Sequence, residues 1–218
     1  MGDNDTVRDQ PRWVASSDFD TAFAVARRYH ADQTRKTDDT PYISHLMAVS
    51  ALVTEHGGSQ VQAAAALLHD AIEDTPMTHA HLTELVGAAV ADIVLECTDD
   101  TDRGDESLMT REQRLTDWRR RKDVYLERLA HKPDGAPSLL VVLADKTHNS
   151  EQAAREIQRW RAAGKDVTEF WANFNAPRES QQWWYRSLLE VLGAKTWPPT
   201  ALPLLERFRA AVDLIQSV

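Results

Sequence analysis

The sequence holds little of what disulfide-bonded, membrane-spanning or secreted proteins require. It has one cysteine, Cys97, so no internal disulfide can form, and a reducing compartment such as the cytoplasm is the simplest expectation. Its longest apolar runs, residues 63–68 and 139–144, are far shorter than the ~20 residues of a membrane-spanning helix. The first 15 residues are polar and acidic, unlike a secretory signal, and are expected to form a flexible tail. We therefore expect a soluble, cytoplasmic protein with no membrane partner.

Glycine and positive charge are also scarce. Only eight residues are glycine while 42% are hydrophobic, which excludes a disordered or collagen-like chain. The 34 acidic residues outnumber the 25 Lys and Arg, which gives a net charge of -9. Because nucleic-acid binding needs a basic face that neutralises phosphates, this charge argues against a nucleic-acid partner. It does not exclude a small phosphorylated metabolite, whose binding depends on cations close to the site.

Apolar residues recur at helical spacing along nearly the whole chain, and no strand-like alternation is found. One segment, residues 138–145, is ambiguous by periodicity alone, because Val141 and Val142 would suit a strand. Helical character continues through residues 151–160, so a buried helix is the more economical interpretation. The sequence thus predicts an all-α fold. We expect helices that begin near residue 17, at Pro41 and after Ser59 (this one running to Asp74), then helices over residues 78–86, 87–98 and 110–130, and a final helix through residues 205–215.

We expect one domain over residues 16–218, because two independent domains would be cramped in a chain of this length. Its core would cover about residues 18–160, and residues 165–218 would form a C-terminal helical extension. Aromatic residues concentrate in that extension, among them Trp171, Trp183 and Trp184. Core packing is the simpler interpretation of these rings, and a platform on which a base stacks is the alternative.

A His69-Asp70 pair near the end of the third predicted helix offers an imidazole and a carboxylate, which manganese-, iron- or cobalt-type ions accept as ligands. Alone the pair is weak evidence, since a histidine there can equally be a packed or capping residue. Glu73 and Asp74 follow at helical spacing, so three acids crowd one helix end. Negative charge at a helix C-terminus is unfavourable unless a cation compensates for it, which favours a functional site. The alternative is a solvated turn at residues 74–76.

Three segments occur in order: HADQTRKTDDTPYISHLMAV, ALLHDAIEDTPMT and VVLADKTHNS. Together they resemble the HD-domain hydrolases, specifically the RelA/SpoT-type guanosine polyphosphate hydrolase domain and its stand-alone relatives. The resemblance extends over about residues 21–150, and more loosely beyond. It implies an HD-domain helical bundle with additional C-terminal helices, and no synthetase activity, because no residues remain for a second catalytic domain.

The resemblance also implies a site. In that family a histidine, the His-Asp pair and a distant aspartate bind one divalent metal ion, usually manganese. A Glu-Asp pair that positions or activates the attacking water falls on Glu73 and Asp74. Tyr42 could pack near a ligand histidine or fill core. The four metal ligands implied here are His45, His69, Asp70 and Asp145.

Substrate contacts are implied for Arg35 and Lys36, which precede the Pro-Tyr pair, and for Lys146 and Asn149 in the third segment. The basic run at residues 119–122 could contact phosphates, although a solvated helix face is the alternative.

The activity implied is manganese-dependent hydrolysis of the 3′-pyrophosphate of ppGpp or pppGpp to GDP or GTP plus pyrophosphate. One alternative is an HD-type phosphohydrolase acting on another nucleotide or phosphate ester. A second is a non-catalytic scaffold or antitoxin-type partner, against which the complete ligand set argues. The sequence leaves the oligomeric state open.

Overall fold

The computed structural model describes residues 16–35, 39–99 and 108–218, and every regular element within these ranges is helical. An isolated antiparallel bridge joins Thr34 to Pro41. The all-α prediction is therefore confirmed for these ranges, whereas the predicted tail of residues 1–15 and Lys36 lie outside them. No described helix is long and apolar enough to cross a membrane. The helices are α1 (Ser17–Tyr29), α2 (Ile43–Glu55), α3 (Gln60–Leu68), α4 (Ala71–Asp74), α5 (His79–Val86), α6 (Ala88–Cys97), α7 (Arg111–His131), α8 (Pro137–Ala162), α9 (Val167–Phe170), the 3-10 helix η2 (Trp171–Asn173), α10 (Arg178–Gly193) and α11 (Leu202–Gln216).

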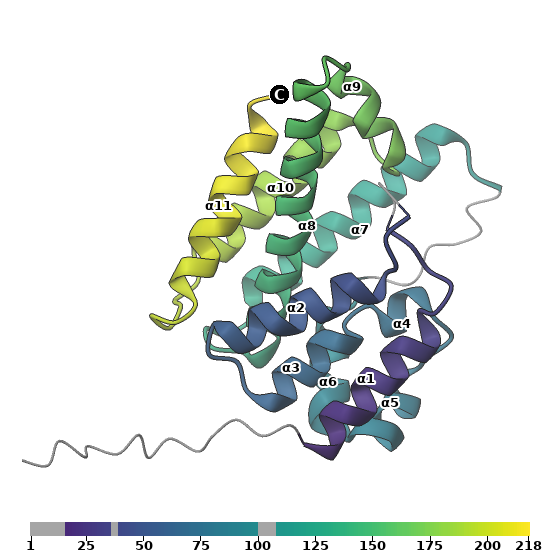
Figure 1. Ribbon diagram of the computed structural model, residues 1–218, viewed down its shortest axis with the longest axis vertical. Coiled ribbons are helices and arrows are strands. Elements are labelled where there is room, and N and C mark those ends of the chain that lie inside the picture. The colour runs from purple at the N-terminus through teal and green to yellow at the C-terminus, as the bar shows by residue number, and fades with distance from the viewer. Residues whose placement is uncertain (1–15, 36–38, 100–107) are drawn as a thin grey trace, which may run out of the picture.

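Helix α8 is the long central element around which the other helices are arranged (Figure 1). Helices α1 to α6 gather around its lower end, and α7, α10 and α11 flank the rest of it. Helix α8 contacts α2, α3, α6 and α11, while α10 packs against both α7 and α11. Buried apolar residues from both groups form one hydrophobic cluster.

The apolar run at residues 139–144 lies in α8, so the strand alternative for this segment is wrong. Pro137 stands in the first turn, where its fixed φ suits a helix and its missing N–H would have had no helical acceptor. Every residue from Leu139 to Asp145 is buried, because α2, α3 and α6 surround this part of α8. The same packing brings the Asp145 carboxylate into the interior.

The predicted single helix from residue 59 to Asp74 is wrong in one respect, because it is interrupted at His69 and Asp70. Helix α3 starts with Ser59 as cap and ends at Leu68, and α4 starts at Ala71. The His69 imidazole donates from Nδ1 to the carbonyl of Ala66 at 2.8 Å. In a continuous helix this carbonyl would accept from the backbone N–H of the next turn. The interruption places His69 and Asp70 at a junction between two helices.

Other predicted boundaries hold within about two residues, the usual uncertainty of helix ends. Helix α2 begins at Ile43 rather than at Pro41, and α7 covers Arg111–His131. Trp171 is 3% exposed and Trp184 is 7% exposed, in agreement with the core-packing interpretation of the C-terminal aromatics.

Candidate metal centre and substrate cavity

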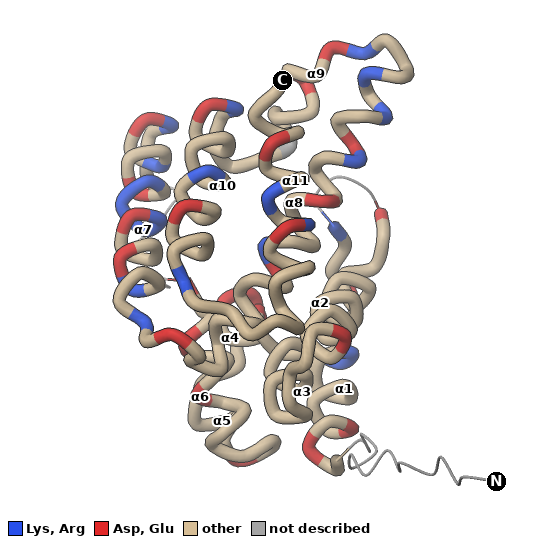
Figure 2. The backbone as a smooth tube through the Cα atoms, turned by 90° about the vertical axis from the view of Figure 1, so that its left-hand side faces the viewer, with Lys and Arg blue, Asp and Glu red and all other residues tan. Residues whose placement is uncertain are grey.

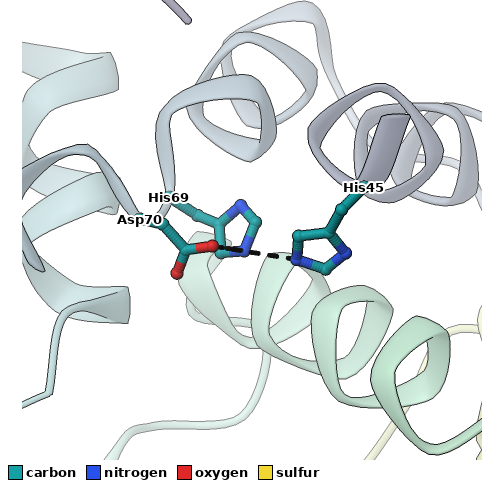
Figure 3. Close-up of side chains that lie close together, drawn as sticks. All are labelled: His45, His69 and Asp70. Carbon is teal, nitrogen blue, oxygen red and sulfur yellow. Dashed lines mark ion pairs between the residues drawn. The ribbon is translucent and has the colours of Figure 1, made fainter. Parts of the chain in front are cut away.

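The structure brings the four predicted metal ligands together from three separate parts of the chain. His45 comes from α2, His69 and Asp70 from the junction of α3 and α4, and Asp145 from α8. Figure 3 shows the two imidazoles and the Asp70 carboxylate turned toward one another. One donor atom each from His45, His69 and Asp70 lies within 4.8 Å of the other two. Asp145 Oδ1 lies 3.2 Å from His45 Nε2 and 3.5 Å from His69 Nε2.

The donor set fits a divalent cation. The Nε2 atoms of His45 and His69 are buried and have no hydrogen-bond partner, which is uncommon for buried polar atoms. His69 Nδ1 donates to the Ala66 carbonyl, so Nε2 of a neutral His69 carries a lone pair that points toward the cluster. Imidazole nitrogens together with carboxylate oxygens suit Mn²⁺, Fe²⁺, Co²⁺ or Zn²⁺. A cation between these groups would satisfy both nitrogens.

The carboxylates of this cluster stay ionised. Burial opposes ionisation of Asp70, but His69 holds the pKa of Asp70 below its usual range. Burial likewise opposes ionisation of Asp145, and the Lys146 ammonium holds the pKa of Asp145 well below its usual range. Burial also disfavours a charged His69, yet Asp70 and Asp145 raise the pKa of His69 well above its ordinary value. The centre therefore attracts positive charge.

Neighbouring side chains orient the two carboxylates. The Tyr42 hydroxyl donates to Asp70 Oδ2 at 2.6 Å, which places Tyr42 at the cluster rather than only in the core. Burial raises the pKa of Tyr42, so this hydroxyl keeps its proton. Lys146 Nζ donates to Asp145 Oδ2 and Asn149 Nδ2 to Asp145 Oδ1, each at 2.6 Å. Two residues expected to bind substrate are thus also supports of a predicted metal ligand.

A cavity of about 450 Å³ opens beside the cluster, and His69, Asp70 and Asp145 form part of its wall. Glu73 and Asp74, the predicted catalytic acids, line the same cavity from α4. The remaining wall is contributed mainly by α7 and α8, with Trp184 from α10. From α7 and α10 it receives the aromatic and cationic residues Trp118, Arg121, Lys122, Tyr125 and Trp184.

A second cavity of about 250 Å³ adjoins the first and shares with it Lys146, Asn149 and other lining residues. Arg35 lines this second cavity, where its guanidinium donates to Gln152 Oε1 at 2.6 Å and to Asn149 Oδ1 at 2.7 Å. The predicted substrate residues Arg35, Lys146 and Asn149 therefore surround one connected space. Lys36 lies outside the described residues.

Two cations on α7 face the first cavity, although sequence analysis left open whether this run is merely a solvated face. Lys122 Nζ pairs with Asp99 Oδ2 at 2.6 Å and lies 4.7 Å from the centre of the Trp184 ring. Arg121 Nε donates to Asp117 Oδ2 at 2.9 Å, and the Arg121 side chain is 8% exposed. Burial lowers the pKa of Lys122, against the opposing effect of Asp99.

Sequence analysis missed several residues that the fold brings to the site. Trp118 lines both cavities, and Gln152 holds Arg35. The pattern gave no signal for these two roles, because each residue occupies an ordinary position on an amphipathic helix. Trp184, for which a base-stacking platform was the alternative to core packing, lines both cavities as well. His148 was also missed: its Nδ1 lies 2.8 Å from Nδ1 of His45. Burial lowers the pKa of His148 to about 3, so its imidazole is neutral.

Comparisons with known proteins identify a family model and several relatives. A family model described as HD domain matches residues 22–181. Human guanosine-3′,5′-bis(diphosphate) 3′-pyrophosphohydrolase MESH1 is 35% identical over 152 residues, which cover 63% of this chain and 76% of MESH1. The Escherichia coli K12 bifunctional (p)ppGpp synthase/hydrolase SpoT is 44% identical over 73 residues, 34% of this chain, and the match spans only 10% of SpoT.

One solved structure, described as a metazoan ortholog of SpoT that hydrolyzes ppGpp and plays a role in starvation responses, superposes with a TM-score of 0.63. It is 26% identical, and the match covers 91% of this chain and 98% of that one. A Listeria monocytogenes EGD-e structure shares the fold, with a TM-score of 0.62 at 24% identity and coverage of 80% and 99%. Since the family model spans more than half of the sequence and MESH1 is matched over most of its length, this chain belongs to the HD-domain family.

Proposed function

We propose that this chain is a divalent-metal-dependent phosphohydrolase that removes the 3′-pyrophosphate of ppGpp or pppGpp. The observation that carries the proposal is the pair of buried, unpartnered Nε2 atoms of His45 and His69, which face ionised carboxylates at the wall of a cavity large enough for a nucleotide. We infer the substrate from the names of the relatives MESH1 and SpoT. Manganese is the proposed ion. We place the reaction in the cytoplasm, because Cys97 is a free thiol.

In this proposal His45, His69, Asp70 and Asp145 hold the ion, which supplies Lewis acidity toward a phosphoryl oxygen and lowers the pKa of water. Glu73 and Asp74 accept the proton of the attacking water and orient it. Their position in α4, directly after the ligand Asp70, supports this role, because the hydrogen bond from Asp74 N–H to the Asp70 carbonyl at 2.8 Å ties the two sites together.

The cations around the two cavities bind the remaining phosphates in this proposal. Arg121 and Lys122 line the first cavity together with the metal cluster, so they are placed to contact phosphate groups. Arg35 and Asn149 line the second cavity, which suits the nucleoside. A substrate with phosphates at two positions of its ribose matches this lining, because cations line both cavities: Arg121 and Lys122 the first, and Arg35 the second.

The proposal is tested by incubating the protein with ppGpp labelled in the terminal 3′-phosphate, in separate reactions with Mn²⁺, Mg²⁺, Co²⁺ and Zn²⁺. We expect labelled pyrophosphate and GDP, fastest with Mn²⁺. Labelled orthophosphate instead would mean that a different bond is cleaved. Intact ppGpp with every ion, in a folded protein that binds metal, would contradict the proposed substrate. Parallel reactions with GTP, GDP and a deoxynucleoside triphosphate measure selectivity.

A further inference from the structure

The two ligand histidines are anchored in different ways. His69 donates from Nδ1 to the backbone carbonyl of Ala66 at 2.8 Å, and a carbonyl can only accept. That contact therefore fixes a proton on Nδ1, so a neutral His69 has a bare Nε2. His45 has no such backbone contact among its hydrogen bonds in the described residues, and its Nδ1 lies instead 2.8 Å from Nδ1 of His148.

A contact of 2.8 Å between two ring nitrogens requires one proton between them. Two bare nitrogens would repel each other, and two N–H groups would clash. His45 is completely buried, and its Nε2 lies 3.2 Å from Asp145 Oδ1 and 3.7 Å from Asp70 Oδ2. A neutral imidazole that ligates through Nε2 must carry its proton on Nδ1. In that arrangement the shared proton belongs to His45, and His148 is the acceptor.

We propose that His148 is a positioning residue: its Nδ1 accepts the proton of His45 Nδ1 and thereby fixes His45 in the tautomer that presents a bare Nε2 to a divalent cation. The inference rests on the metal site of the proposed function and not on the identity of the substrate. Without His148, His45 would be free to carry its proton on Nε2 and to donate it to Asp145 Oδ1, which lies within 3.2 Å. That tautomer would block the ligand position.

The position of His148 in the fold supports this role. It lies on α8 three residues after Asp145, hence on the same face of the helix. Its ring centre is 4.8 Å from that of His45, with 40° between the ring planes. One helix therefore carries both the carboxylate that faces His45 Nε2 and the acceptor that faces His45 Nδ1. An α8 displacement would move both contacts together.

The experiment compares Mn²⁺ binding, by calorimetry or electron paramagnetic resonance, in the wild-type protein and in variants H148F and H148N. H148F keeps a planar ring but removes the acceptor, and we expect it to weaken Mn²⁺ binding by about 10- to 100-fold, as is usual when the support of a ligand is lost. H148N keeps an amide oxygen close to the position of Nδ1, so it should stay within about threefold of wild type. H81F is the matched control, because His81 is an exposed histidine on α5.

Nitrogen-15 NMR of the histidine rings gives a readout that needs neither turnover nor a variant. In the metal-free wild-type protein we expect the proton of His45 on Nδ1 and an unprotonated Nε2, and in H148F a shift of that proton to Nε2. Unchanged Mn²⁺ affinity in folded H148F, equal losses in H148F and H148N, or a wild-type His45 protonated at Nε2 would each overturn the proposal. If H148F does not fold, the wild-type spectrum and H148N decide. A protein that passes these tests but leaves ppGpp intact would refute the proposed substrate and not this inference.

Discussion

The two sides of the cavity beside the predicted metal ligands are built on different principles. On the metal side, α2, α3, α4 and α8 meet deep in the fold, and the side chains of His45, His69 and Asp145 are at most 8% exposed. On the opposite side, α7 and α10 contribute long cationic and aromatic side chains such as Lys122 and Trp184. Figure 2 shows acidic and basic residues along α7, whereas α3 has none. The metal side depends on short contacts among buried donor atoms, and the α7–α10 side on long side chains that reach the cavity from two helices.

This difference predicts two kinds of mutational response. Hydrogen bonds of 2.6 to 2.8 Å hold Asp70, His69 and Asp145 in one position each. Removal of a partner from such a side chain is expected to abolish its function rather than to weaken it. Long side chains that share the binding of a ligand lose affinity in steps, because their neighbours and water compensate in part. Substitutions on the metal side should therefore abolish metal binding or turnover, and those on the α7–α10 side should mainly raise KM.

The largest effect is expected from Asp145→Ala. This change removes a predicted ligand that lies 3.2 Å from His45 Nε2, and turnover should fall at least about 10³-fold, because a catalytic metal supplies several kcal/mol of transition-state stabilisation. Mn²⁺ content measured after gel filtration should fall with it, while circular dichroism shows that the helices remain. Asp213→Ala, an exposed acid on α11, is the control. A variant with normal turnover would exclude Asp145 as a ligand.

The next largest effect is expected from Glu73→Gln and Asp74→Asn, which keep the size of each side chain and remove its negative charge. If these residues accept the proton of the attacking water, kcat should fall by about 10² to 10⁴. Mn²⁺ affinity should change little, because neither is a predicted ligand. Glu84→Gln, on the exposed side of α5, is the control. A parallel loss of Mn²⁺ binding would show that Glu73 or Asp74 ligates the metal instead.

A graded effect is expected from Lys122→Gln on the α7–α10 side. Lys122 lines the cavity, and loss of one charge-assisted contact of about 1.5–2 kcal/mol should raise KM by roughly 10- to 30-fold with a smaller change in kcat. Because this substitution also removes the partner of buried Asp99, the double variant with Asp99→Asn separates substrate binding from stability. Lys132→Gln is the control, since Lys132 follows the last residue of α7, pairs with Glu96 at 2.7 Å and does not line the cavity. An unchanged KM would remove Lys122 from the substrate site.

The metal side could be predicted from the sequence because its chemistry is carried by short motifs. The His69-Asp70 pair, the acids that follow it and the distant Asp145 sit in segments that together resemble one family, and the structure brings these residues together. Their ligation of a metal stays a prediction. The interruption between α3 and α4 was not foreseen, because it depends on a side-chain hydrogen bond from His69 that competes with the helix.

The α7–α10 side could not be predicted in this way. Arg35 contacts Gln152 across 117 positions of sequence, and Trp184 reaches Lys122 only because α10 packs against α7. A tryptophan at an apolar helical position looks the same in the sequence whether its ring packs in the core or lines a cavity. The Trp184 ring does both. The rotation of α7 about its axis decides which of its positively charged residues face the cavity. Sequence periodicity identifies the apolar face of this helix, but it does not identify which helices or which cavity lie beside it.

The smallest effect should come from Arg119→Ala, which tests whether the function of α7 is confined to its inner face. The Arg119 guanidinium lies 3.3 Å from the centre of the Trp183 ring and is half-exposed, as is its partner Asp123. Its loss should lower the free energy of unfolding by about 0.5–1 kcal/mol, the usual value of an exposed cation–π contact, as measured by urea denaturation. KM and kcat should not change, because the Arg119 side chain contacts the Trp183 ring and does not line the cavity.

Arg209→Ala, which breaks an exposed pair on α11, is the control for the loss of a surface arginine. Arg119→Ala could instead raise KM as much as Lys122→Gln does. Phosphate binding would then depend on the combined electrostatic field of residues 119–122, and the division of α7 into two faces would be wrong.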